Sequence, residues 1–104
     1  MATSNQPTKG QPWIHYVCVE DYANPGNFKL NPTIALADWQ VGLDDAAFGN
    51  FLTLPVLSPA GSRWIKLVFD ASETNGQIVK IQGIDQTSPK EWSDFNVAIP
   101  TTTW

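Results

Sequence analysis

Cysteine and histidine are almost absent from this sequence, which contains Cys18, His15 and no others. A single cysteine excludes a disulfide within the chain and a zinc site built from several cysteines. A single histidine excludes a metal site made of several imidazoles. Because the two residues lie three positions apart in one apolar stretch, we expect both to be packed residues of a strand.

Charge is also scarce. Charged residues make up 15% of the chain, whereas soluble domains average about 25%. Ser, Thr, Asn and Gln together number 28, against 16 charged side chains, so much of the surface is expected to be neutral and polar. Such a surface is weakly protected against association, which favours a protein that sits beside neighbours. The net charge of −4 and the pI of 4.6 argue against a nucleic-acid partner, because phosphate binding needs basic patches.

Long apolar runs and targeting signals are missing as well. No apolar run approaches the roughly 20 residues that a membrane-spanning helix needs, so we expect no membrane partner. The N-terminal residues are polar with one lysine and do not resemble a signal peptide. With 104 residues, the chain is long enough for one core and too short for two.

Residues that could carry catalysis are few, and each has a structural explanation. Phosphate-binding glycine loops are absent. Asp44 and Asp45 lie in an expected turn, where aspartate is favoured for its conformation. Asp70 is expected to cap a helical turn, with Glu73 in the position of a capping box. We therefore expect no enzymatic activity, no metal and no cofactor.

Proline and glycine interrupt the sequence at short intervals, which argues against long helices. Between these breaks, apolar residues alternate with polar ones or form β-branched and aromatic runs, which predicts strands. Strands are expected at residues 13–19, 33–36, 39–43, 62–69, 77–85 and 91–99, with one short helical turn at 70–76. The pattern predicts an all-β fold: a six- to seven-stranded antiparallel β-sandwich with an immunoglobulin-like Greek key.

The two ends of the chain lack the strand pattern. Residues 1–12 form a polar arm, residues 13–100 the single sandwich domain, and residues 101–104 a C-terminal extension. Because the arm has no apolar period, we expect it to add nothing to the core and to reach a neighbouring molecule instead.

Five tryptophans are many for a chain of this length, and four of them are candidate interface residues. Alternation in the expected strands sends Trp64 and Trp92 away from the inward face that carries Ile65, Leu67, Phe95 and Val97. Trp13 begins a strand and Trp104 ends the chain. Two or three of these rings could simply cover the ends of the sandwich. Otherwise they are anchors of a protein interface, where Trp is favoured, or platforms on which a sugar ring stacks.

Several short motifs after Phe28 fall at turns and strand edges. They are Asn-Pro-Thr-Ile-Ala at 31–35 with Asp38, Asp-Asp-Ala-Ala-Phe at 44–48, Leu-Pro at 54–55, Ser-Pro-Ala-Gly-Ser at 58–62, Ala-Ser-Glu-Thr-Asn at 71–75 and Glu-Trp at 91–92. Over about 70 residues the chain thereby resembles an immunoglobulin-like β-sandwich domain of tailed-bacteriophage virion structural proteins. That family has glycines where Asp45 and Ala46 stand here. Alanine with a positive φ costs about 1 kcal/mol or more, so this turn is expected to differ in type.

The resemblance implies a non-enzymatic structural protein of the virion. It is most like a small capsid decoration (cement) protein, which would bind the major capsid protein and stabilise the head shell. This implies a homo-oligomer, with a trimer favoured, on the capsid exterior, after assembly in the host bacterial cytoplasm. A tail, baseplate or head–tail adaptor module is the alternative. A carbohydrate-binding module for attachment to the host surface is a further alternative from a different class.

Overall fold

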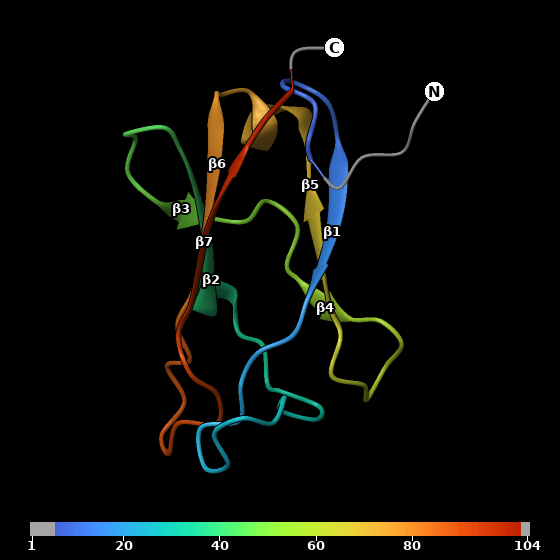
Figure 1. The fold of residues 1–104 in the computed structure, drawn as a ribbon, viewed down its shortest axis with the longest axis vertical. Coiled ribbons are helices and arrows are strands. Elements are labelled where there is room, and N and C mark those ends of the chain that lie inside the picture. Colours follow the sequence, from blue (N-terminus) through green and yellow to red (C-terminus); the bar gives the residue numbers. More distant parts are fainter. Residues whose placement is uncertain (1–5, 103–104) are drawn as a thin grey trace.

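The computed structural model describes residues 6–102 as two antiparallel β-sheets that face each other (Figure 1). The strand order is β1-β5-β4 in the first sheet and β3-β2-β6-β7 in the second. The strands are β1 (Trp13–Val17), β2 (Trp39–Leu43), β3 (Gly49–Asn50), β4 (Val56–Leu57), β5 (Ile65–Phe69), β6 (Ile78–Gly83) and β7 (Phe95–Pro100). The 3-10 helices η1 (Leu36–Asp38) and η2 (Ala71–Thr74) complete the elements. The predicted β-sandwich and its helical turn near 70–76 are thus confirmed.

The chain changes sheets between β1 and β2, between β3 and β4, and between β5 and β6. As a result, β5 lies between β1 and β4, and β2 pairs with β6 in the centre of the other sheet. This strand order is that of the expected Greek key.

The core lies between the two sheets and is built from residues that alternate along the strands. On β5, Ile65, Leu67 and Phe69 are buried, while Lys66 and Val68 between them are partly exposed. On β6, Val79 and Ile81 are buried in the same alternating way. These inward positions are the predicted ones. Phe95, Val97 and Ile99 of β7 pack against this core as partly buried residues.

Trp39 is fully buried in the core, and its ring lies directly on the backbone of Gly83. A Cβ at Gly83 would come within 2.9 Å of that ring. We therefore expect Gly83→Ala to lower the free energy of unfolding by about 2 kcal/mol, because an overpacked core must shift. The matched control is Gly49→Ala on β3, where a Cβ meets nothing within 4 Å. Urea denaturation of both variants tests the expectation, and equal midpoints would contradict it.

The expected polar arm is packed onto the domain over the part that the structure describes. Pro7 is almost fully buried, so the expectation that the arm adds nothing to the core is wrong there. Thr8 forms a parallel bridge with Thr102, flanked by hydrogen bonds from Thr102 N to Pro7 O (2.9 Å) and from Lys9 N to Thr102 O (2.7 Å). Backbone hydrogen bonds, rather than an apolar pattern, hold this segment in place.

The strand expected at residues 33–36 is replaced by irregular chain and η1. Asp38 N donates to Ala35 O at 3.0 Å, and Ala35 N donates to the Asp38 carboxylate at 3.1 Å. These two reciprocal bonds close a turn, which removes the residues from any sheet. The β-branched residues Thr33 and Ile34 favoured a strand, but this local turn overrides that preference.

The turn at residues 44–47 connects β2 to β3 as expected, without the conformation that would strain alanine. The positive φ belongs to Asp44 (53°) and not to Ala46. Aspartate tolerates this conformation better than most residues do. Its carboxylate also accepts hydrogen bonds from the backbone N–H groups of Gln77 (3.1 Å) and Ile78 (2.9 Å), which secures the turn.

Candidate interaction surface

The four candidate tryptophans have different environments. Trp64 is 49% exposed, as predicted. Trp13 is partly buried, because its ring stacks on His15 (4.7 Å between centroids) and packs on Phe69 (4.9 Å). Trp92 is fully buried, so the prediction that it faces outward is wrong. Trp104 lies outside the described residues, and its role stays a prediction.

Trp92 is buried because it precedes the last strand instead of belonging to it. The backbone of Trp92 forms an isolated antiparallel bridge with Asp21, and β7 begins only at Phe95. The alternation that places Phe95 inward therefore does not extend back to Trp92. The indole stacks on Trp39 with 5.5 Å between ring centroids, and its Nε1 donates to Thr33 O at 3.2 Å. Trp92 is a core residue and is not available to a partner in the folded domain.

The outer side of the first sheet carries several exposed apolar side chains, and the exposed Trp64 directly precedes β5. The register pairs Ile14 with Val68, and it places Tyr16 on β1 and Val56 on β4 on either side of Lys66. Paired residues share a face, so all of these side chains point away from the core. We call Ile14, Tyr16, Val56, Trp64, Lys66 and Val68 the β1–β5–β4 face. Its first four members are between 47% and 51% exposed.

The composition of this face is that of an interface more than of an ordinary surface. Lys66 is the only lysine, arginine or carboxylate in the three strands. Tyr and Trp supply two of the exposed members, and both are enriched in the buried centres of protein interfaces. Contiguous exposed apolar side chains are uncommon on isolated soluble proteins and mark sites of association.

The edge of this sheet at β1 is open. Within residues 6–102, the backbone of β1 pairs only with β5, so its other side has no strand beside it. Proteins usually protect such an edge with lysine, proline or a bulge. The sequence of β1 is Trp-Ile-His-Tyr-Val, which contains neither lysine nor proline. An extended segment of a partner could add to the sheet here.

His15 and Cys18, near this edge, are held in their uncharged forms. Burial lowers the pKa of His15, so its imidazole is neutral at pH 7. The nearby Arg63 charge lowers the pKa of Cys18, but burial raises it by more. The net raised pKa favours the uncharged thiol. A thiol is a much weaker nucleophile than a thiolate. The expectation of a packed strand residue is confirmed for His15, whereas Cys18 is partly buried but lies one residue beyond the end of β1.

Several carboxylates, exposed or buried, hold backbone turns. Asp70 caps η2 and accepts from Ser72 N (2.9 Å) and Glu73 N (3.1 Å), while Glu73 accepts from Asp70 N (2.9 Å). The predicted capping box is therefore confirmed. The second oxygen of Glu73 also accepts from Leu52 N at 3.0 Å, a contact that the sequence did not reveal. Among residues 6–102, no group of three or more His, Cys, Asp or Glu residues could hold a metal ion.

No helix in the described part of the chain is long and apolar enough to cross a membrane. Comparison of the chain with known proteins finds no matching family model, no similar curated protein and no similar solved structure.

Proposed function

We propose that this chain is a non-catalytic structural module that binds another protein through the β1–β5–β4 face. The observation that supports the proposal is that Ile14, Tyr16 and Val56 lie exposed on one side of one sheet around the single charge of Lys66, with the exposed Trp64 directly before β5. A surface of this kind is costly to leave in water and gains free energy when a partner covers it.

The sequence resemblance suggests the partner. We infer that the chain is a virion protein of a tailed bacteriophage, most like a capsid decoration protein that binds the major capsid protein and stabilises the head shell. A homo-oligomer, with a trimer favoured, agrees with the open β1 edge and with the low charge of the chain. A tail, baseplate or head–tail adaptor module would use the same face.

Quantitative mass spectrometry of purified virions from the phage that encodes this chain tests its place in the particle. A decoration protein is expected at a copy number comparable to that of the shell subunit. An adaptor would be present in only a few copies per particle. Absence of the chain from the virion would contradict the proposal.

The face itself is tested by substitution. We expect Tyr16→Ala combined with Trp64→Ala to weaken binding to undecorated particles at least tenfold, since truncating a buried aromatic anchor typically costs 2 kcal/mol or more. Tyr22→Ala is the matched control, because Tyr22 is 56% exposed but lies in the loop after β1, outside this face. If the double variant occupies the particles as fully as the wild type does at limiting protein, the docking surface must lie elsewhere on the chain.

A further inference from the structure

The outer side of the second sheet carries a row of four amide side chains, one from each strand. The register places Gln40 of β2 beside Asn50 of β3 and beside Gln82 of β6, and places Gln82 beside Asn96 of β7. Their chain neighbours Trp39, Phe51 and Ile81 are buried, so the amides face outward. Since neighbouring strands lie about 4.8 Å apart, the row crosses the sheet over about 14 Å.

The amides are not consumed by bonds to one another. Gln40 Nε2 donates to Asn50 Oδ1 at 3.2 Å. The side chains of Gln82 and Asn96, by contrast, have no hydrogen-bond partner in the part of the chain that the structure describes. Asparagine is disfavoured in strands because its short amide competes with the backbone. Asn96 in β7 goes against this preference, and such local conflicts are expected where a residue serves function.

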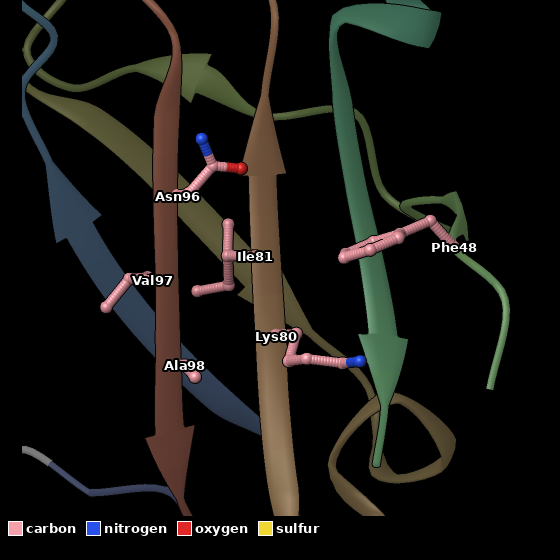
Figure 2. A pocket seen from close by; sticks show the side chains of 6 residues that line it. All are labelled: Phe48, Lys80, Ile81, Asn96, Val97 and Ala98. Carbon is pink, nitrogen blue, oxygen red and sulfur yellow. The ribbon is translucent and has the colours of Figure 1, made fainter. Parts of the chain in front are cut away.

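A shallow cavity of about 280 Å³ opens beside the row. It is lined by Phe48, Lys80, Asn96 and Ala98 together with Ile81 and Val97 (Figure 2). The Phe48 ring is seated over Gly42, where even a Cβ would lie 3.3 Å from it, and Lys80 Nζ lies 5.6 Å from the ring centroid. Figure 2 shows Lys80 extending from β6 towards Phe48, with Asn96 beside the gap between β6 and β7. An aromatic ring thus lines the same cavity as Asn96, the last amide of the row.

The charge on this face selects the class of ligand. Lys80 is the only charged residue in the four strands, and they contain no carboxylate. One cation cannot neutralise a run of phosphates, which argues against nucleic acid. An amide offers two N–H donors and a carbonyl acceptor, so it can bond to neighbouring hydroxyl groups. A ring such as Phe48 can pack against the C–H face of a pyranose.

We propose that the outer face of β3-β2-β6-β7 binds an uncharged polysaccharide along the row Asn50, Gln40, Gln82 and Asn96. Evenly spaced amides fit a polymer with repeated hydroxyl groups better than a single small molecule. The site uses the sheet opposite to the β1–β5–β4 face and does not depend on the proposed function. In this proposal, amide side chains bind the sugar, and not the tryptophan platforms expected from the sequence.

Affinity electrophoresis in native gels that contain soluble mannan, dextran, xylan or hydroxyethyl cellulose tests the proposal. We expect at least one of these polysaccharides to retard the wild-type chain. Gln82→Ala combined with Asn96→Ala is expected to weaken that retardation at least tenfold, expressed as a dissociation constant. Gln77→Ala is the matched control, because this exposed amide lies next to β6 and outside the row.

Thermal melting monitored by circular dichroism shows whether the double variant keeps its fold, which we expect because both side chains are unbonded. NMR spectra of the side-chain amide groups give a second readout that does not need the variants. The largest shifts on adding the retarding polysaccharide are expected at Gln40, Gln82 and Asn96. Absence of retardation by all four polysaccharides would overturn the proposal, as would full retardation of the folded double variant or shifts confined to the β1–β5–β4 face.

Discussion

Replacing Asp85 by alanine is expected to lower the free energy of unfolding by about 3 kcal/mol, measured by urea denaturation. Asp85 is 4% exposed, and its side chain organises the loop between β6 and β7. One carboxylate oxygen accepts from Thr87 N (2.9 Å) and from the Thr87 hydroxyl. The other accepts from Glu91 N (2.6 Å) and Trp92 N (3.3 Å). Alanine would leave several of these donors without a partner inside the protein.

Asp94→Ala is the control, because Asp94 lies in the same loop but is exposed and bonds only to Lys90. An exposed pair of this kind contributes little to stability. If the two variants had the same denaturation midpoint, the hydrogen bonds of Asp85 would not hold the loop.

The same carboxylate is expected to make the domain sensitive to acid. Burial alone would raise the pKa of Asp85, but the hydrogen bonds from Thr87, Glu91 and Trp92 outweigh it and lower the pKa below its usual value. A lowered pKa in the folded state adds stability at pH values above about 3.9, the usual value for aspartate. That contribution is lost as the pH falls further, through the folded-state pKa. Asp85→Asn should flatten this part of the stability profile, and an unchanged slope would contradict the assignment.

Truncation of Trp92 and of Trp64 is expected to separate the core from the surface. Trp92→Ala should cost about 3–5 kcal/mol of unfolding free energy, because it empties a site stacked on Trp39 and leaves Thr33 O without its donor. Trp64→Ala should change stability by about 0.5 kcal/mol or less, as for most surface substitutions. Urea midpoints of the two variants measure the difference.

Trp92→Phe is a useful second variant if Trp92→Ala does not fold, because it keeps an aromatic ring in the core and removes only the indole donor. We expect its stability to lie between those of the wild type and Trp92→Ala. A Trp64→Ala variant as unstable as Trp92→Ala would mean that Trp64 is part of the core.

The fold was predictable where a local rule agrees with the tertiary structure. The alternation of Ile65, Leu67 and Phe69 identifies an inward face without knowledge of any partner strand. Asp70 and Glu73 predict the helical turn, because both partners of a capping box lie within three residues. The prediction failed where bonds distant in sequence decide. Pro7 is buried by pairing with a segment more than 90 residues away, which no local pattern reveals.

The candidate surfaces could also be predicted only in part, because they join residues from several strands. Trp64 was predicted to be exposed and is, because the alternation of β5 extends one residue before the strand begins at Ile65. Its neighbours Tyr16 and Val56 come from two other strands, and only the register brings them together. The amide row likewise joins four strands, so its members are unrelated in the sequence. Trp92 was misplaced because the period of β7 was extended across residues 93–94, which lie outside the strand.

Hydroxyl-radical footprinting of the chain, free and bound to the phage particle that we propose as its partner, tests the proposed docking most directly. The method reports the solvent access of aromatic side chains, and this chain has exposed aromatic residues both on the proposed face and away from it. We expect Tyr16 and Trp64 to become protected on the particle, while Tyr22 and Phe28, which are 56% and 59% exposed, stay reactive. Protection of Tyr22 and Phe28 with full reactivity of Tyr16 and Trp64 would contradict docking through the β1–β5–β4 face.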